Sequence, residues 1–421
     1  MIKRILKQYL KNQRFKQALA LSMVNVINIP LSVISSIIIT RFLGPSSYGD
    51  FKFLLNVFKL SVVIFSFGFF QAGNRALVLN HDLQKGREIY GAMLIILSIL
   101  FTLMGIFLLS YAFFDNNIYE KGLQIQLIYL IPFSWVFLFV RYFETLFQAD
   151  NKIKLLANSR LLPKLAFFIS VLIIYFFYLN YNGNKLTILL GLFLMTQILV
   201  FIYIIYKINP SFNNVKTRIR EIFTFNKSFG FNVYIGSLTA VGFSQLTGIL
   251  ISYFAKDNSG VGFYSLAATI SAPLSFIPNV IATTHYKDFS TSKNISRKLM
   301  LITFIISCTA LSLTLLLVSP FIKYFYGPEF NPVIYLTYIV SFGVILFGYA
   351  DFFNRFLGAH GKGKALRNSA VLVGFSTMVF NFTLIPRFGE SGAAYTLVFS
   401  GMIYVLCMLW YYQKVINNLE A

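Results

Sequence analysis

Long apolar segments recur along the whole chain, separated by short polar or basic stretches. Each is about 20 residues or longer, the length that an α-helix needs to cross a bilayer. Segments such as 92–114 and 299–318 show no alternation of polar and apolar positions, which excludes the strands of a membrane barrel. The pattern predicts about twelve membrane-spanning helices, with approximate limits 18–40, 53–78, 90–113, 123–147, 155–179, 187–206, 229–254, 262–285, 299–322, 333–356, 367–386 and 392–412.

Composition supports this interpretation. Of the 421 residues, 57% are hydrophobic and 12% are charged, against about 25% charged in ordinary soluble domains. The two cysteines, Cys308 and Cys407, lie inside apolar segments, and the three histidines have no ligand spacing. We therefore expect no disulfide, no metal and no cofactor. The apolar segment after the basic residues 1–16 is long for a signal peptide and lacks a small-residue cleavage site, so we interpret it as a retained helix.

The net charge of +22 would suggest nucleic acid in a soluble protein. Here the basic residues alternate between loops: 27 of the 36 Lys and Arg fall on one side of the predicted helices and 7 on the other. This split places both termini in the cytoplasm and explains the charge without nucleic acid. The longest polar connection lies near the middle of the chain. It predicts a six-helix lobe over 1–206, a cytoplasmic linker over 207–228 and a second lobe over 229–421.

Polar residues form stripes on several predicted helices when they are placed at 100° per residue. A stripe avoids lipid, so it either lines a hydrated cavity or bonds one helix to another. Because several stripes are long and include charges, we predict a central cavity lined by Asn25, Asn28, Ser32, Asn56, Ser66, Ser134, Gln148 and Gln245.

Charged residues inside the spans are the sharper signal, because an ionised group near the bilayer centre costs at least about 2.5 kcal/mol. Lys59 has no carboxylate at helical spacing in its own span. Arg141 and Glu144 have i,i+3 spacing and can form an internal pair that locks helices together. We interpret Lys59 and Arg141 as candidate anion-binding residues. Arg75, at the end of the second span, either joins them or anchors the helix at the membrane surface.

A second pair with helical spacing, Asp351 and Arg355, lies near a cytoplasmic end. It forms an ion pair, or Arg355 extends to the interface. With Glu144, these residues are candidates for coupling transport to an ion gradient.

Motifs for chemistry outside the membrane are absent from the sequence. It contains no Gly-Lys-Ser/Thr phosphate loop, no His-Glu-x-x-His and no Cys-x-x-Cys. Outer loops are about a dozen residues or fewer by the span estimates, too short for a glycan-transfer domain. We therefore expect a protein that is not an enzyme.

Several loop sequences resemble motifs of one family in the same order along the chain. They are Arg41-Phe-Leu-Gly-Pro-Ser-Ser-Tyr-Gly49, Gly260-Val-Gly-Phe-Tyr-Ser-Leu-Ala267, Tyr326-Gly-Pro-Glu-Phe330 and the stretch from Asn381 to Ala394 with Leu384-Ile-Pro-Arg387 inside it. This set resembles the Wzx-type polysaccharide and O-antigen flippases of the multidrug/oligosaccharidyl-lipid/polysaccharide exporter superfamily.

The resemblance implies two six-helix lobes around a central cavity, as in multidrug and toxic-compound extrusion (MATE) transporters. It also implies a flippase of undecaprenyl-diphosphate-linked oligosaccharide that works by alternating access in the bacterial inner membrane. Lys59, Arg141 and Arg75 would hold the diphosphate. The expected partners are this substrate, membrane lipid and glycan-synthesis proteins, and we expect a monomer. The alternatives are a drug/cation antiporter of the same superfamily and a membrane scaffold of a glycan-synthesis complex.

Overall fold

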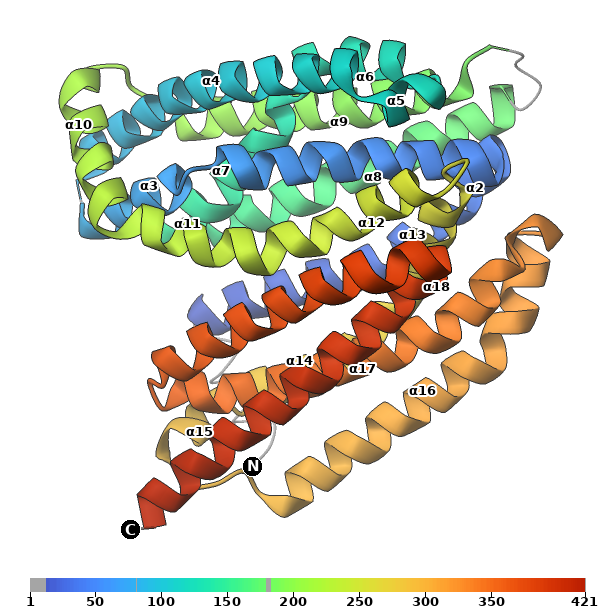
Figure 1. The fold of residues 1–421 in the computed structure, drawn as a ribbon. Helices are drawn as coiled ribbons and strands as arrows, with labels where there is room; N and C mark the ends of the chain where they lie inside the picture. The colour runs from blue at the N-terminus through green and yellow to red at the C-terminus, as the bar shows by residue number, and fades with distance from the viewer. Residues whose placement is uncertain (1–12, 81, 179–182, 421) are drawn as a thin grey trace. The chain divides into compact units, whose positions relative to one another are not determined.

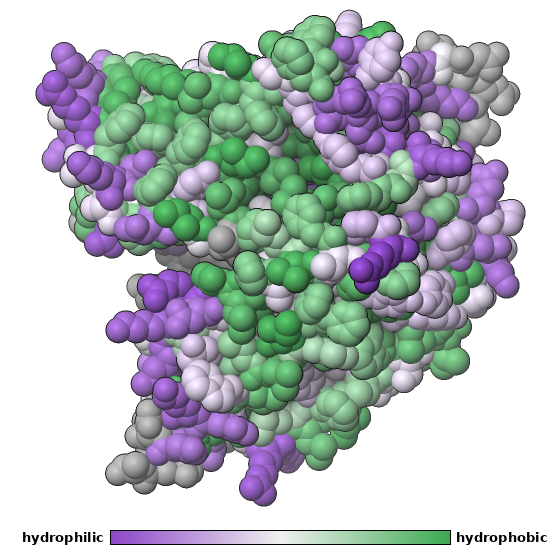
Figure 2. Space-filling model, in the orientation of Figure 1, coloured by the Kyte–Doolittle hydropathy of each residue, from purple (hydrophilic) through white to green (hydrophobic). Residues whose placement is uncertain are grey.

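The structure is a computed structural model that describes residues 13–80, 82–178 and 183–420, apart from the side chains of 13–22, 25, 178, 239–240 and 418–420. Every regular element in these ranges is a helix. Eight of the described helices are long and apolar enough to cross a membrane, and a bent pair adds a ninth. Figure 2 shows apolar residues along the helices and hydrophilic residues gathered at helix ends. The chain is therefore an all-α, multi-pass membrane protein, as predicted.

Two helices are too long to cross a bilayer once. Helix α2 (Gln13–Phe65) has 53 residues and α18 (Gly363–Glu420) has 58, whereas about 20 residues span the hydrocarbon core. Each is kinked at a glycine with positive φ: 75° at Gly44 and 56° at Gly389. Figure 1 shows α18 folding back after its kink. Each long helix therefore supplies two predicted spans, and glycine permits the turn because it lacks a Cβ.

Five predicted spans coincide with single helices: α4 (Leu83–Phe114), α8 (Ile153–Tyr178), α9 (Lys185–Ile208), α16 (Arg297–Phe325) and α17 (Pro332–Ala359). The others are interrupted. The second span breaks between α2 and α3 (Phe69–Leu79), where Phe67 and Gly68 have positive φ. The fourth bends by 44° near Ser134. A break in a membrane helix frees backbone N–H and C=O groups that a continuous helix would keep hydrogen-bonded.

Residue contacts divide the chain into two compact units, which we call unit 1 (residues 1–42 and 61–235) and unit 2 (residues 43–60 and 236–421). The predicted lobe boundaries at 206 and 229 stay a prediction. The other elements of unit 1 are α5 (Asn116–Glu120), α6 (Gln124–Leu130), η1 (Ile131–Phe133), α7 (Trp135–Ala149), α10 (Val215–Phe225) and η2 (Asn226–Gly230). Helix α11 (Phe231–Ser237) follows η2. Element η3 (Leu238–Gly242) comes next, inside the seventh predicted span, 229–254. The other elements of unit 2 are α12 (Phe243–Phe254), α13 (Ser259–Ser271), α14 (Pro273–Thr284), α15 (Tyr286–Thr291) and η4 (Pro328–Phe330).

Buried tyrosines fix α7 within unit 1. The Tyr142 hydroxyl donates to the carbonyl of Tyr90 on α4 at 3.1 Å, and the Tyr90 hydroxyl donates to Asp150 Oδ2 at 2.8 Å. Both tyrosine side chains are fully buried, so their hydroxyls need these partners. These bonds hold α7 against α4. Glu144, two positions after Tyr142, lies on a different face of α7 from the one that contacts α4.

The polar connection after α9 is ordered by an ion-pair network. Arg218 of α10 pairs with Glu88 on α4, at 3.0 Å between Nε and Oε2, and with Glu221 one turn away. Burial lowers the pKa of Arg218, but its hydrogen bonds to Glu221 and Glu88 outweigh burial and raise the pKa above its ordinary value. Asn214 also donates to Glu88, at 3.0 Å. Helix α10 is therefore clamped to the start of α4.

In unit 2, residues 43–60 pack closely against α12 and α13. A Cβ added at Gly49 would overlap the backbone carbonyl of Asn258, and one added at Gly248 would overlap the Asn56 amide. The fully buried Asn258 donates to Asp50 Oδ1 at 2.8 Å. The glycines therefore allow an approach that any larger residue would prevent.

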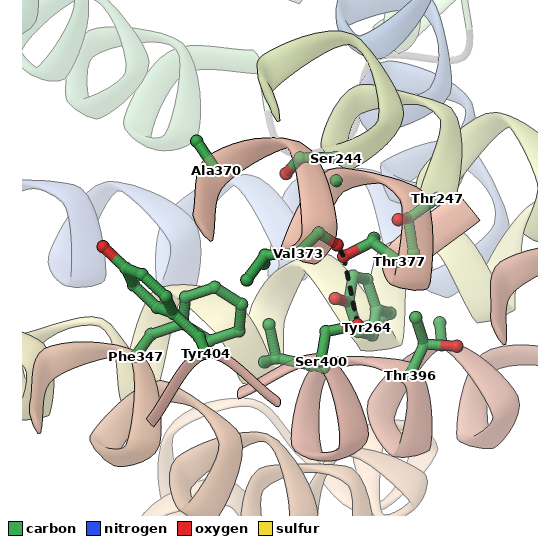
Figure 3. Close-up of a pocket in the computed structure, with 13 residues that line it drawn as sticks. Ser244, Thr247, Tyr264, Phe347, Ala370, Val373, Thr377, Thr396, Ser400 and Tyr404 are labelled. Atoms are coloured by element: carbon green, nitrogen blue, oxygen red, sulfur yellow. Dashed lines mark hydrogen bonds between the residues drawn. The ribbon is translucent and has the colours of Figure 1, made fainter. Parts of the chain in front are cut away.

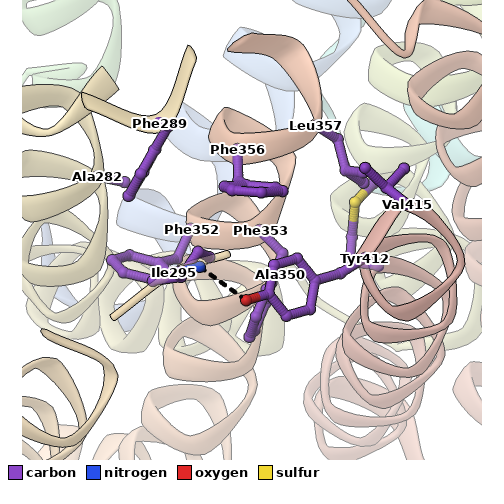
Figure 4. Close-up of a cluster of buried hydrophobic side chains, with 11 residues drawn as sticks. Ala282, Phe289, Ile295, Ala350, Phe352, Phe353, Phe356, Leu357, Tyr412 and Val415 are labelled. Carbon is purple, nitrogen blue, oxygen red and sulfur yellow. Dashed lines mark hydrogen bonds between the residues drawn. The ribbon is translucent and has the colours of Figure 1, made fainter. Parts of the chain in front are cut away.

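An aromatic cluster joins α14, α15, α17 and α18 at one end of unit 2 (Figure 4). Phe352, Phe353 and Phe356 of α17 are buried there beside Tyr412 of α18. The Tyr412 hydroxyl accepts a hydrogen bond from the backbone amide of Ile295 at 2.9 Å. This cluster fixes the register of α17 against α18, two helices that also form a cavity further along.

Candidate functional site

Unit 1 contains a polar cavity of about 270 Å³ between four of its helices. Its walls come from α2, α7, α8 and α9, and the lining residues are Asn28, Val140, Phe143, Glu144, Ser159, Arg160, Lys164 and Gln197. We call this the charged cavity. It has two basic side chains and one carboxylate, so its formal charge is positive and it suits an anion.

Glu144 and Arg160 form an ion pair across the charged cavity. Arg160 Nε lies 3.3 Å from Glu144 Oε1, and the two side chains are 27% and 31% exposed. The geometry is not that of a hydrogen bond, since Arg160 Nε is buried without a hydrogen-bond partner. Lys164 lies one turn further along α8, on the same face as Arg160. Arg160 and Glu144 therefore attract each other without a hydrogen bond between Arg160 Nε and the carboxylate, and Lys164 places a second positive charge beside them.

Depth along α8 makes these cations unusual. The helix begins at Ile153 beside Lys152 and Lys154, the basic residues expected at a cytoplasmic interface. At 1.5 Å per residue, Arg160 and Lys164 lie about 10 and 16 Å further along the axis. From the first residue of the predicted span 155–179, Lys164 is about 14 Å along the axis, close to half the thickness of a 30 Å hydrocarbon core. A cation at that depth is costly unless it faces a polar cavity, as these two do.

The wall of the charged cavity formed by α2 carries a hydrogen-bond acceptor that has no partner among the described residues. The Asn28 side chain is 8% exposed, and its Oδ1 has no hydrogen-bond partner among the described residues. A buried amide oxygen usually has a partner. Because Asn28 lines the charged cavity, the missing donor would come from water or from a bound molecule.

Of the sequence-predicted site residues whose side chains the structure describes, two line this cavity, Asn28 and Glu144. The i,i+3 pair between Arg141 and Glu144 is not formed: Glu144 contacts Arg160 instead, because α8 brings that guanidinium across the cavity. Arg141 is exposed on α7 and makes no hydrogen bond or ion pair with the described residues.

The remaining predicted residues of unit 1 lie elsewhere. Ser134 is buried at the bend before α7, where it donates to the carbonyl of Ile131. Ser32 donates to the carbonyl of Asn28, and Ser66 donates to Val63 at the helix break. Gln148 and Arg75 are exposed. The Asn25 side chain lies outside the described residues.

In unit 2 the predicted residues are also dispersed. Asn56 packs against Gly248, Lys59 is exposed and Gln245 is half-buried. Asp351 does not pair with Arg355, which is exposed. Instead Asp351 Oδ1 accepts from the Tyr404 hydroxyl at 2.9 Å and Oδ2 from Asn279 at 3.4 Å. The i,i+4 pair is replaced by neutral donors from α18 and α14.

A second cavity, of about 350 Å³, lies within unit 2 between α12, α13, α17 and both arms of α18 (Figure 3). The residues that line it are Ser244, Thr247, Tyr264, Phe347, Ala370, Val373, Gly374, Thr377, Ala393, Thr396, Leu397, Ser400 and Tyr404. We call it the hydroxyl cavity, because more than half of these side chains carry a hydroxyl and none carries a formal charge.

The sequence analysis identified neither the two basic residues of the charged cavity nor the hydroxyl cavity. The split of 27 to 7 between the two sides includes Arg160 and Lys164 among the cytoplasmic charges, although both fall inside the predicted span 155–179. Their i,i+4 spacing within that span was the available signal. None of the residues that line the hydroxyl cavity is among those predicted to line a cavity, because serine and threonine are too common in membrane helices to mark a site from sequence.

Comparison with known proteins points to one group. The family model for polysaccharide biosynthesis proteins matches residues 15–286. A "Capsular polysaccharide biosynthesis protein CapF" of Staphylococcus aureus is 24% identical over 282 residues, covering 64% of this chain and 70% of that protein. A "Putative O-antigen transporter" of Escherichia coli strain K12 is 23% identical, covering 95% of this chain and 96% of that protein.

Solved structures share the fold. The lipid II flippase MurJ, in an inward closed conformation, superposes with a TM-score of 0.76 at 15% identity, covering 94% of this chain and 89% of that one. An inward-facing MATE family multidrug transporter of the multidrug/oligosaccharidyl-lipid/polysaccharide (MOP) superfamily gives a TM-score of 0.66 at 14% identity, covering 93% and 95%. At these identities the likeness establishes the fold alone.

Proposed function

We propose that this chain, which belongs to the polysaccharide biosynthesis protein family, is a flippase that carries an undecaprenyl-diphosphate-linked oligosaccharide across the bacterial inner membrane. The observation that carries the proposal is the pair Arg160 and Lys164, two cations that line one polar cavity and fall inside the predicted span 155–179. A diphosphate loses its hydration in hydrocarbon and crosses only where fixed charges replace that water.

The charged cavity supplies the interactions that such a head group needs. Arg160 offers a planar set of N–H donors, which suits phosphate oxygens, and Lys164 adds a second positive charge one turn away. Glu144 holds Arg160 while the cavity has no ligand, and a phosphate displaces this carboxylate as it binds. The loose 3.3 Å pair favours such an exchange, since little hydrogen bonding is lost.

Transport would proceed by alternating access, with the head group in the cavity and the polyprenyl tail in lipid. In this proposal both termini are cytoplasmic, and the glycan-synthesis proteins supply the substrate. Lys59, Arg141 and Arg75 remain predicted ligands of the diphosphate at another stage of transport, and coupling to an ion through Glu144, Asp351 and Arg355 remains a prediction. A drug/cation antiporter would need an acidic cavity, whereas two of the three charged residues in the charged cavity are basic.

The test is a double variant, Arg160→Gln with Lys164→Gln, in cells that lack the chromosomal copy. At equal amounts in the membrane, we expect loss of surface polysaccharide and accumulation of the lipid-linked oligosaccharide. The matched control is Lys216→Gln with Arg220→Gln, an exposed basic pair on α10 with the same spacing. Normal surface polysaccharide in the cavity variant would reject the proposal.

A further inference from the structure

The hydroxyl cavity of unit 2 has the chemistry of a site for a neutral, polyhydroxylated ligand. Its lining residues include no Lys, Arg, Asp or Glu, so no cation there compensates the charge of a phosphate. It suits a prenyl tail less well than a sugar, because a hydrocarbon would leave the hydroxyls of Tyr264 and Ser244, which have no partner among the described residues, without a hydrogen bond. A sugar ring carries both hydroxyl groups and apolar C–H faces, which the cavity matches.

Free hydrogen-bonding capacity faces this cavity. The Tyr264 hydroxyl and the exposed Ser244 hydroxyl have no hydrogen-bond partner among the described residues. The Thr377 hydroxyl has a single proton, which is shared between the carbonyl of Val373 at 2.8 Å and Ser400 Oγ at 3.0 Å, and the second contact joins the two arms of α18. Figure 3 shows Tyr264 beside this pair. Polar groups from α12, α13 and α18 therefore converge on one space, as they do in small-molecule sites.

Two aromatic rings form another wall. The rings of Phe347 and Tyr404 lie 5.6 Å apart at 48° and stand side by side in Figure 3. Tyr404 is held in place: its hydroxyl donates to Asp351 and accepts from Asn354 Nδ2 at 2.9 Å. A ring fixed in this way offers a preorganised apolar face, on which the C–H face of a pyranose can pack.

We infer that the hydroxyl cavity is a saccharide subsite, which binds a neutral sugar residue of the translocated oligosaccharide. The inference rests on the proposed function. In it, the charged cavity of unit 1 binds the anionic groups of the substrate, and the hydroxyl cavity of unit 2 binds a sugar residue. Ser244, Tyr264, Thr377 and Ser400 bond the sugar hydroxyls. Phe347 and Tyr404 contact its apolar face.

The test uses a reporter cysteine at the cavity wall. Ala370 lines the cavity and is exposed, so Ala370→Cys in a Cys308→Ser, Cys407→Ser background reacts with a water-soluble maleimide. The probe is the neutral oligosaccharide released by mild acid from the lipid-linked pool of the producing cells. At millimolar concentration it should slow labelling several-fold. A cysteine at the exposed Ser290 of α15 is the control and should be unaffected.

Tyr264→Phe sharpens this test. Because the Tyr264 hydroxyl has no partner among the residues that the structure describes, its removal should leave the melting temperature unchanged and weaken protection by the oligosaccharide roughly 2- to 10-fold. Thr377→Val with Ser400→Ala should weaken protection further, whereas Tyr335→Phe, outside the cavity, should not. No protection at any concentration, or protection that survives loss of all three hydroxyls, would overturn the inference.

A second probe separates this failure from failure of the proposed function. Undecaprenyl diphosphate carries no sugar, so its binding should depend on Arg160 and Lys164 and not on Tyr264. If undecaprenyl diphosphate binds with this dependence but the released oligosaccharide gives no protection, only the saccharide subsite is rejected. If undecaprenyl diphosphate also binds regardless of Arg160 and Lys164, the proposed function is contradicted as well.

Discussion

Replacing Glu144 by glutamine removes the carboxylate that contacts Arg160 and keeps the side-chain volume. In the proposed mechanism this carboxylate competes with the phosphate for the same guanidinium. Glu144→Gln should therefore tighten binding of undecaprenyl diphosphate, although removing a charge from the interior of a membrane protein usually weakens function. The sign of the effect distinguishes a competing carboxylate from one that binds the ligand or a cation.

The size of the effect follows from the burial of the pair. Exposed ion pairs contribute about 0–1 kcal/mol, and breaking a buried pair costs about 3–5 kcal/mol. The side chains of Arg160 and Glu144 are 27% and 31% exposed, between these limits. Releasing Arg160 should therefore return about 1–2 kcal/mol to the ligand, which corresponds to roughly 5- to 30-fold tighter binding.

The assay is titration of the purified protein in lipid nanodiscs with undecaprenyl diphosphate, followed by native mass spectrometry. Glu120→Gln, an exposed carboxylate on α5, is the matched control and should leave affinity unchanged. Unchanged or weaker binding by Glu144→Gln would show that Glu144 does not compete for the phosphate, and the exchange step would have to be abandoned.

Four further predictions concern other parts of the molecule. Arg160→Gln or Lys164→Gln alone should weaken undecaprenyl diphosphate binding roughly 10-fold, from the loss of one charge-assisted bond, in the same titration. Arg218→Ala leaves the buried Glu88 without its cation and should lower the melting temperature by about 5–10 °C, whereas Arg220→Ala on the same helix should not. Gly49→Ala places a Cβ against the backbone of Asn258 and should prevent accumulation of folded protein, whereas Gly86→Ala, which meets only Leu77 at 4.0 Å, should be tolerated. If Lys59 and Arg141 bind the diphosphate at another stage, Lys59→Ala and Arg141→Ala at normal membrane levels should each abolish surface polysaccharide; normal polysaccharide in both would remove them from the site.

The fold could be predicted from sequence because the bilayer imposes a strong constraint on it. A segment of about 20 apolar residues has few alternatives to a spanning helix, and the predicted spans coincide with helices across the described residues. The interruptions were harder to predict. Phe67 has positive φ without being glycine, and Gly68 beside it is one glycine in the apolar run 53–78, which a continuous membrane helix can also contain.

The site was less predictable because a helical wheel orders residues within one helix only. Arg141 and Glu144 share a face of α7, but the partner of Glu144 comes from α8, sixteen positions further along the sequence and adjacent only after folding. Asp351 illustrates the same limit, since its partners Tyr404 and Asn279 lie on α18 and α14. Spacing along one helix therefore identified candidate charges without identifying the groups that surround them.

Translocation itself provides the most direct test of the central claim, that cations inside unit 1 replace the hydration of a phosphorylated lipid head. Proteoliposomes would contain the purified protein and the lipid-linked oligosaccharide of the producing cells, and a membrane-impermeant enzyme would cleave only the oligosaccharide that reaches the outer leaflet. We expect protein-dependent cleavage that disappears in Arg160→Gln with Lys164→Gln and persists in Lys216→Gln with Arg220→Gln. Equal rates of cleavage in both double variants and the unmodified protein would contradict the account.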